Sequence, residues 1–318
     1  MSFIIGTDEA GYGPNLGPLV VGASVWEVPD HVAAEGMYDH LARCINADPR
    51  QKAGQRVVVA DSKQLHKGES LAPLERCVLP LLAQLGKKPE SWRAIWPLIA
   101  ELSADELASQ PWHDEFDEPL PTGADSTEIA ASAARLQSGL ASCDSRLVDL
   151  RARALFPPSY NREVRRHDNK AEVLSLTTLE LARGLIVALP PGPVTLVCDK
   201  HGGRDYYAGV LAHVFESFVR VHAETRELGV YHLQFAGHPL EVRFVMKGER
   251  HLPVALASVT AKYLRELAMR PFNGFWQRQV AGLKPTAGYY VDACRFREEI
   301  RAAQASLRIE DDLFWRER

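Results

Sequence analysis

The sequence has 318 residues, of which 46% are hydrophobic, so the chain is long enough to bury the core of one large domain. It holds no run of 18 apolar residues and no charged and then apolar leader before the first predicted strand, which excludes a membrane protein and favours a soluble, cytoplasmic one. The formal net charge of −4 gives no sign of a nucleic-acid partner.

The N-terminal third begins with a predicted β-hairpin over residues 1–28. An apolar run at 3–7 enters a glycine-rich turn, and a second apolar run at 19–26 returns from it. Residues 55–60 form a short apolar run that ends at DSKQL, where Asp61 or Ser62 is placed to cap a helix. Residues 66–145 are mostly helical in composition and are broken by proline and glycine.

The rest of the chain alternates between strand and helix signals. Apolar and polar residues alternate strictly over 147–155, which predicts a half-exposed strand. The elements predicted after it are a helix at 169–189, a strand at 194–199, a helix at 205–217, short strands at 218–247 and a helix at 252–269. This order predicts an α/β fold with one mixed β-sheet flanked by helices, in a single domain over 1–318. We expect residues 80–145 to form an inserted helical lobe.

The five cysteines are widely spaced and odd in number: Cys44, Cys77, Cys143, Cys198 and Cys294. Neither a CxxC nor an HExxH pattern occurs. This argues against a structural zinc site and for a reducing compartment.

Four acidic residues follow or end predicted elements. Asp8 and Glu9 close the first strand, Asp199 closes the strand at 194–199, and Glu249 directly precedes the long helix. Each acid taken alone is typical of a turn or of a helix start. Four at successive element ends would repel one another unless a cation offsets them. The set therefore predicts a site for a hard divalent ion, Mg²⁺ or Mn²⁺.

The glycines at positions 11, 13 and 17 follow the first acid pair. Their spacing is GxGxxxG between two strands, which is not the dinucleotide-binding fingerprint, and no GxxxxGK[ST] phosphate loop occurs. Glycines at such a turn let the backbone approach a ligand and present N–H groups to a phosphate or a sugar.

These segments resemble the motifs of the type 2 ribonuclease H family, the ribonucleases HII and HIII. GTDEAGYGPNLGPLVVGAS (6–24) is similar to its DEAGRG signature, and ADSKQL (60–65) to its DSKxL segment. HDNKAEVLSLTTLELARGLI (167–186) and LVCD (196–199) resemble the helix and strand that bring the third acid. MKGERHLPVALASVTAKYLRELAM (246–269) resembles its KGD…ASxxAK segment, and TAGYY (286–290) its late GY motif. The motifs keep the family's order and cover roughly 1–65, 146–200 and 240–300.

The resemblance implies a ribonuclease H-like fold and hydrolysis of the RNA strand of an RNA–DNA hybrid. Asp8, Glu9, Asp199 and Glu249 would bind two divalent ions, Mg²⁺ or Mn²⁺. Two such ions about 4 Å apart activate a water and stabilise the leaving oxygen of a phosphodiester displacement. The four carboxylates equal the whole formal charge of −4, so the remainder of the chain is neutral.

The resemblance also implies the substrate contacts. Gly11, Gly13 and Tyr289 would contact the ribose 2′-hydroxyl, which distinguishes RNA from DNA. The cations expected to contact phosphates are Lys63, Lys247 and Lys262, with the basic run Arg162, Arg165, Arg166, His167 and Lys170. Each lysine alone is also typical of a solvated surface charge. His201 is interpreted as a surface-loop histidine, with proton transfer near the metals as the alternative.

Three departures set the chain apart from the family pattern. Tyr12 stands where the family has arginine, Glu249 stands where aspartate is usual, and CDKHGGRDYY (198–207) is unlike the family's segment after the third acid. We expect Tyr12 to contact substrate and to change specificity more than chemistry, with packing of its ring onto the neighbouring hairpin as the alternative. Insertions at roughly 80–145 and 205–240 also allow a catalytically altered nucleic-acid-binding protein, or a nuclease acting on branched DNA. The expected partner is an RNA–DNA hybrid or a ribonucleotide-containing duplex, and no protein partner is indicated.

Overall fold

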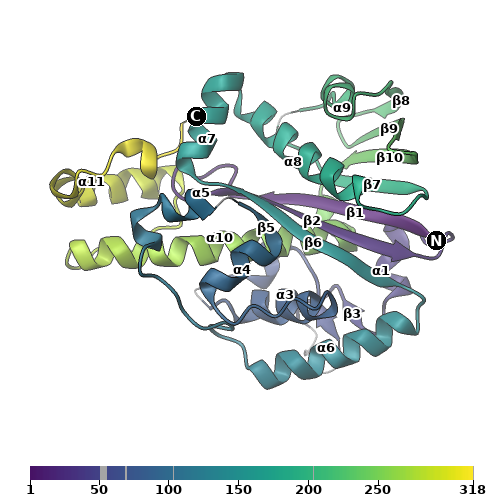
Figure 1. Ribbon diagram of the computed structural model, residues 1–318, viewed down its shortest axis with the longest axis horizontal. Coiled ribbons are helices and arrows are strands. Elements are labelled where there is room, and N and C mark those ends of the chain that lie inside the picture. The colour runs from purple at the N-terminus through teal and green to yellow at the C-terminus, as the bar shows by residue number, and fades with distance from the viewer. Residues whose placement is uncertain (51–55, 69, 103, 203, 318) are drawn as a thin grey trace.

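The computed structural model describes residues 1–50, 56–68, 70–102, 104–202 and 204–317. A mixed eight-stranded sheet runs through the molecule in the order β5-β6-β2-β1-β7-β10-β9-β8 (Figure 1). Its strands are β1 (Ser2–Ala10), β2 (Leu19–Val28), β5 (Ala100–Glu101), β6 (Arg146–Leu155), β7 (Val194–Asp199), β8 (Arg220–Glu224), β9 (Leu228–Phe235) and β10 (His238–Val245). A separate parallel pair joins β3 (Ile45–Asn46) to β4 (Val57–Val58).

The strand β1 lies at the centre of the sheet. It pairs antiparallel with β2, as the predicted hairpin requires, and parallel with β7. On the other side of β7, β10 also runs parallel to it, and β9 and β8 follow antiparallel. The predicted mixed α/β sheet is therefore confirmed.

Helices cover both faces of the sheet (Figure 1). The longer ones are α3 (Ala72–Gln84), α4 (Trp92–Ile99), α6 (Ser126–Ala141), α7 (Pro157–His167), α8 (Lys170–Val187), α9 (Ala208–Phe215), α10 (Leu252–Gln279) and α11 (Tyr290–Leu307). The shorter ones are α1 (Met37–His40), α2 (Ser62–Leu65), α5 (Ala104–Ala108) and the 3-10 helices η1 (Ala34–Gly36), η2 (Pro111–His113), η3 (Gly248–Arg250) and η4 (Asp311–Leu313). One apolar core fills the α10, α3 and α4 side, and a second fills the α8 and α9 side.

Two glycines in the hairpin set the position of α10. A Cβ at Gly6 would lie 2.1 Å from the backbone of Pro253, and one at Gly22 would lie 2.3 Å from the carbonyl oxygen of Ala257. The Ser24 hydroxyl also donates a 2.7 Å hydrogen bond to the carbonyl oxygen of Pro253. The first turns of α10 therefore rest directly on the β1–β2 backbone, close to the predicted acids.

Residues 80–145 are mainly helical, and their described part adds one two-residue strand, β5, to the edge of the main sheet next to β6. The helices pack into the same core as α10: the Trp92 indole N–H donates a 2.8 Å hydrogen bond to the carbonyl oxygen of Leu267. That this segment is an insertion stays a prediction.

Most of the other predicted elements occur near their expected bounds. The helix expected at 169–189 is α8, and the side chain of Asn169 caps it through the N–H of Ala171. Of the run 55–60, residue 55 lies outside the described residues, and only Val57–Val58 are strand. The helix expected at 252–269 extends to Gln279. Among the described residues, no helix has the length and apolar character needed to span a bilayer.

Candidate metal centre and nucleic-acid interface

The carboxyl ends of the two central parallel strands bring three acids to one edge of the sheet. Asp8 and Glu9 lie in the last three residues of β1, and Asp199 is the last residue of β7. The parallel register pairs Thr7 with Cys198, so Asp8 and Asp199 follow at the same level. Asp8 is buried at 7% exposure, and Glu9 is half-buried.

The fourth acid arrives through the turn between β10 and α10. Val245 pairs with Asp199 in the sheet, and Asp199 Oδ1 accepts a 2.7 Å hydrogen bond from the N–H of Gly248. Lys247 adopts a left-handed backbone conformation (φ 59°), which turns the chain into η3. Glu249 is the next residue of η3, so the hydrogen bond that fixes Gly248 also brings Glu249 to Asp199.

The pKa values of three of these carboxyls show that the acids share one region. Burial, then the charges of Glu9 and Asp199, raises the pKa of Asp8 well above 3.8. Burial and Asp199 raise the pKa of Glu9 to about 7, against the opposing effect of Lys63. Burial, with a contribution from Glu249, raises the pKa of Asp199 to about 6 although the Gly248 N–H opposes it. Ionising all of them without a cation is therefore unfavourable.

The donor set suits a hard divalent cation. It consists of carboxylate oxygens, which Mg²⁺ and Mn²⁺ prefer, and a bound cation would offset the repulsion that raises these pKa values. Within the part of the chain that the structure describes, no three histidine, cysteine, aspartate or glutamate side chains are gathered tightly enough to hold a metal as they stand. The acids thus lie in one region but do not form a complete set of metal ligands in this conformation.

The glycine-rich loop continues from β1 past the acids. Gly11 has a positive φ of 90°, and a Cβ there would lie 2.5 Å from the carbonyl oxygen of Pro18, so glycine is required at this position. Gly13 is exposed, and a Cβ there would meet no atom within 4 Å. Between them, the Tyr12 ring is partly buried against Gly202, and the Lys170 ammonium lies 5.0 Å above it.

The predicted lysines differ in their surroundings. Lys63 lies in α2, whose first turn is capped by Asp61, and its charge acts on Glu9 and Asp199. Lys247 is exposed beside η3. Lys262, on α10, pairs with Glu266 one turn along the helix. Lys63 is thus the predicted phosphate-binding lysine whose charge the structure brings to the acids.

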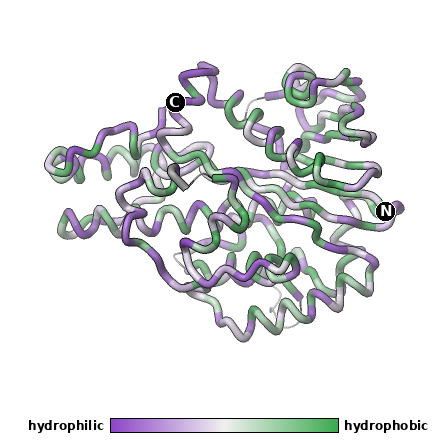
Figure 2. Tube along the Cα trace, viewed as in Figure 1, coloured by the Kyte–Doolittle hydropathy of each residue, from purple (hydrophilic) through white to green (hydrophobic). Residues whose placement is uncertain are grey.

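The predicted tyrosine and the basic run lie around the loop. Tyr289 is 60% exposed and immediately precedes α11. The basic run belongs to α7, which is largely hydrophilic (Figure 2), and to the start of α8. Arg165 pairs with Asp312 and Glu317 of the C-terminal segment, whereas Lys170 reaches Tyr12.

The interpretation of His201 as a surface-loop histidine is wrong. The side chain is 2% exposed, its Nδ1 lies 3.0 Å from the Ser175 hydroxyl, and its ring packs edge-on against Tyr207 and Phe244. Burial lowers the pKa of His201 to about 3, so the ring is neutral at pH 7. The residue belongs to the core beside the site because the segment after Asp199 folds back over β10.

Two buried arginines behind the loop were missed by the sequence analysis. Arg265 of α10 is 3% exposed and donates hydrogen bonds to the carbonyl oxygens of Leu16 and Ala287, at 3.1 and 2.9 Å. Arg316, near the C-terminus, is 1% exposed and bonds the carbonyls of Gly11 and Tyr12. A charge on the apolar face of the 252–269 helix was a signal for Arg265. The sequence holds no comparable signal for Arg316, whose acceptors at Gly11 and Tyr12 lie 305 and 304 positions away.

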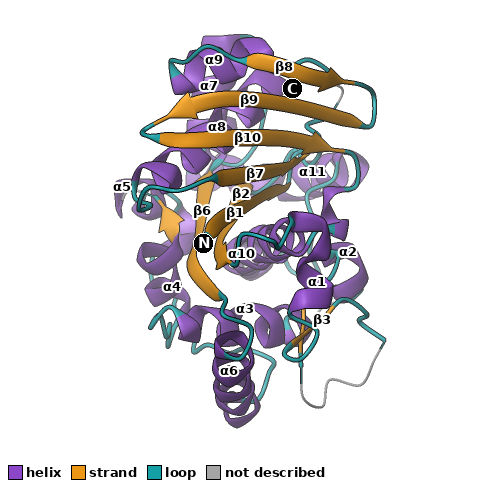
Figure 3. Cartoon of the chain, turned by 90° about the vertical axis from the view of Figure 1, so that its right-hand side faces the viewer, coloured by secondary structure: helices purple, strands orange, loops and turns teal. Residues whose placement is uncertain are grey.

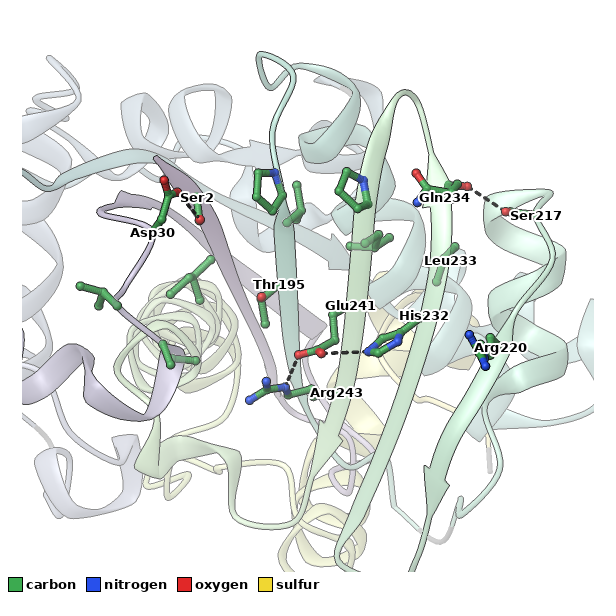
Figure 4. A pocket seen from close by; sticks show the side chains of 18 of the residues that line it. Ser2, Asp30, Thr195, Ser217, Arg220, His232, Leu233, Gln234, Glu241 and Arg243 are labelled. Carbon is green, nitrogen blue, oxygen red and sulfur yellow. Dashed lines mark hydrogen bonds and ion pairs between the residues drawn. The ribbon is translucent and has the colours of Figure 1, made fainter.

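A hollow of about 790 Å³ lies at the opposite end of the central strands. It is bounded by the N-terminal ends of β1 and β7 and by the face of β8–β10 turned to the viewer in Figure 3, with α8 and α9 behind. Within it, Glu241 contacts both His232 and Arg243, at 2.9 and 2.5 Å (Figure 4). None of the four acids lines this hollow, so it is separate from the candidate metal site.

Comparison with known proteins gives fold similarities only. No family model matches the sequence, and no curated protein is similar to it. Among solved structures, a ribonuclease HII from Archaeoglobus fulgidus, in complex with PCNA, is 15% identical, with 99% of this chain and 94% of that one covered and a TM-score of 0.44. A Bst ribonuclease HIII bound to Mn²⁺ is 18% identical (98% and 65% covered, TM-score 0.42), and a Pyrococcus horikoshii ribonuclease H2 is 13% identical (98% and 92% covered, TM-score 0.40). These are members of the family whose motifs the sequence resembles.

Proposed function

We propose that the chain is a metal-dependent endonuclease that hydrolyses the RNA strand of RNA–DNA hybrids or of ribonucleotide-containing duplexes. The observation that supports the proposal is that the register of β1 and β7 and the Asp199–Gly248 hydrogen bond bring Asp8, Glu9, Asp199 and Glu249 toward one edge of the sheet, although the residues are up to 241 positions apart in sequence. The motif resemblance supplies the substrate class.

In this proposal the four acids hold two divalent ions, Mg²⁺ or Mn²⁺. When bound, such ions polarise a phosphate oxygen and lower the pKa of a bound water. The chain's own contribution is to converge carboxylates that are costly to ionise without a cation, which ties their deprotonation to cation binding. The turn held by Asp199 and Gly248 keeps Glu249 among them.

The substrate would lie across the glycine-rich loop. Lys63 is placed to neutralise a phosphate near the acids, and Lys247 and Lys262 would contact the backbone further away. The backbone at Gly11 and Gly13 and the hydroxyl of Tyr289 would contact the ribose 2′-hydroxyl. Tyr12 offers an aromatic face to a base or a sugar.

The five cysteines are free, which supports a reducing compartment and hence the cytoplasm.

A cleavage assay tests the proposed function. End-labelled RNA–DNA hybrid, a DNA duplex with one ribonucleotide, an all-DNA duplex and a branched DNA junction are each incubated with Mg²⁺, with Mn²⁺ or with EDTA. We expect cutting of the ribonucleotide-containing substrates only, and only with metal. Cleavage of the junction would show that the protein is a nuclease acting on branched DNA. Binding without cleavage in either metal would show that it is a nucleic-acid-binding protein without nuclease activity.

A further inference from the structure

The C-terminal segment lies directly against the glycine-rich loop. The N–H of Arg316 donates a 2.8 Å hydrogen bond to the carbonyl oxygen of Asn15, and the Asn15 side-chain amide donates a 3.1 Å bond back to the carbonyl oxygen of Arg316. An isolated bridge pairs Leu16 with Trp315. The loop and the last residues of the chain therefore form one small unit.

The Arg316 side chain extends this contact under the loop. Its guanidinium donates to the carbonyl oxygens of Gly11 and Tyr12, the latter at 3.2 Å, and stacks 4.0 Å above the Tyr160 ring. No carboxylate of the described residues pairs with it, and its buried Nε–H has no partner. A buried charge satisfied mainly by two carbonyls depends on those carbonyls staying in place, and it holds them there in turn.

The orientation of these carbonyls fixes the orientation of two N–H groups. The C=O and N–H of a trans peptide point in opposite directions. Because the carbonyls of Gly11 and Tyr12 point inward to Arg316, the N–H groups of Tyr12 and Gly13 point away from it. Within the described part of the chain, neither N–H donates a hydrogen bond. Two successive free N–H groups form a small anion- or hydroxyl-binding concavity.

Arg265 holds the other end of the same loop. Its bonds to the carbonyls of Leu16 and Ala287 join the loop to the segment before α11, where the N–H of Asn15 donates a 2.8 Å bond to the carbonyl of Gly288. Arg265 of α10 thus fixes the far end of the loop, and Arg316 fixes the Gly11 and Tyr12 peptides at the end nearest the acids.

We propose that Arg316 is a positioning residue: it locks the Gly11 and Tyr12 peptides so that the N–H groups of Tyr12 and Gly13 face the ribose and phosphate of the substrate. The claim that Arg316 fixes the loop rests on contacts within the chain. The claim that the loop then faces a substrate rests on the proposed function. Arg316 touches no substrate itself and acts through the loop.

Hydrogen exchange tests the lock without any substrate. In Arg316→Gln we expect the amides of Asn15 and Leu16 to exchange at least tenfold faster than in the wild type, because the loop that carries them loses the guanidinium donors to its Gly11 and Tyr12 carbonyls. The matched control is Glu317→Gln, which removes the exposed ion pair with Arg165 beside Arg316 without touching the loop. Unchanged exchange in Arg316→Gln would overturn the lock.

Binding tests the substrate half. In an Asp8→Asn background, so that nothing is cut, the affinity for a duplex with one ribonucleotide is compared with that for an all-DNA duplex. We expect Arg316→Gln to reduce this preference about tenfold, by weakening binding of the ribonucleotide-containing duplex more than binding of the all-DNA duplex, with Glu317→Gln retaining the preference. Faster exchange with an unchanged preference would overturn the substrate role.

Two further results keep the outcomes separate. If the wild type shows no preference for ribonucleotides, the proposed function fails. Hydrogen exchange then still tests whether Arg316 fixes the loop. If Arg316→Gln does not fold, Arg316→Lys, which keeps the charge and one donor, replaces it and should give an intermediate exchange rate and preference. Failure of both to fold would show that Arg316 supports the core rather than the loop and would overturn the proposal.

Discussion

Asp199 Oδ1 accepts a 2.7 Å hydrogen bond from the backbone N–H of Gly248, so the acid that ends β7 holds the turn that precedes Glu249. One carboxyl therefore has two separable roles. As a charge it acts on the other acids, and as an acceptor it satisfies a backbone donor at the start of η3.

Substitutions at Asp199 should separate these roles. Asp199→Asn keeps an oxygen for the Gly248 N–H but removes the charge, so we expect stabilisation of the fold by Mg²⁺ to fall sharply while the fold persists. Asp199→Ala removes both, and we expect it to be less stable than Asp199→Asn by about 1–2 kcal/mol. Thermal unfolding with Mg²⁺ and with EDTA measures both. Equal stability of the two variants would mean that the hydrogen bond does not hold the turn.

Asp8→Asn should abolish cleavage without loss of the fold. Asp8 is the most buried of the four acids, and burial, Glu9 and Asp199 all raise its pKa. Removing its charge relieves that repulsion, so we expect the metal-free variant to be more stable at pH 7 by on the order of 1 kcal/mol. The measurement is unfolding in EDTA beside the cleavage assay. Full activity with the usual metal dependence would remove Asp8 from the site.

The stability contribution of Glu9 should depend on pH in a defined direction. Its folded pKa, about 7, lies above the ordinary 4.5, so the folded state binds more protons between these values. The metal-free fold therefore loses stability through this group as pH rises from about 4.5 through 7. The buried histidines His113 and His201 act in the opposite direction, because burial lowers their pKa values to about 4 and about 3. The pH dependence of the free energy of unfolding of the wild type is thus a sum of opposed contributions.

A difference measurement isolates the Glu9 contribution. The free energy of unfolding of Glu9→Gln minus that of the wild type, in EDTA, should increase by about 2–3 kcal/mol between pH 5 and pH 8. Saturating Mg²⁺ should reverse the sign at pH 8, because the wild type then gains cation binding that the variant lacks. A difference that does not change with pH would show that Glu9 is not held at a raised pKa.

Gly6 is required for helix packing rather than for ligand approach. The Cβ of Gly6→Ala would lie 2.1 Å from the backbone of Pro253, so α10 must move off β1. We expect a loss of about 3 kcal/mol in the free energy of unfolding. Gly184→Ala on α8 is the control: a Cβ there meets nothing within 4 Å, so the stability should be unchanged or slightly higher. Equal effects of the two substitutions would contradict this account of the close approach.

The sequence predicted what depends on local pattern. The hairpin, the α8 helix with its Asn169 cap and the position of Asp199 at a strand end all follow from periodicity and from residues next to one another. What depends on distant parts of the chain was missed. Arg316 meets Gly11 only because the C-terminal segment returns across α7, and His201 is buried only because its segment folds back over β10. No local pattern encodes such contacts.

The structure changes the argument about Tyr12 without removing it. The sequence left open whether the residue faces a substrate or packs on the hairpin. Its ring lies against Gly202 and under Lys170, so the segment after β7 and the start of α8 both contact it. The residue remains only partly buried. A ring braced in this way is pre-oriented, which lowers the entropy cost of stacking on a base or a sugar.

We therefore expect Tyr12 to bind substrate without adding a salt-sensitive contact. An arginine at this position would add one phosphate contact, so the slope of log affinity against log salt for RNA–DNA hybrid should be steeper by about 1 in Tyr12→Arg than in the wild type. Tyr12→Phe keeps the ring and removes the hydroxyl, and should match the wild-type slope. Affinities measured across a salt series for all three proteins decide the matter. Equal slopes for Tyr12→Arg and the wild type would mean that this side chain faces the protein, because a solvent-facing guanidinium beside a bound phosphate cannot leave counterion release unchanged.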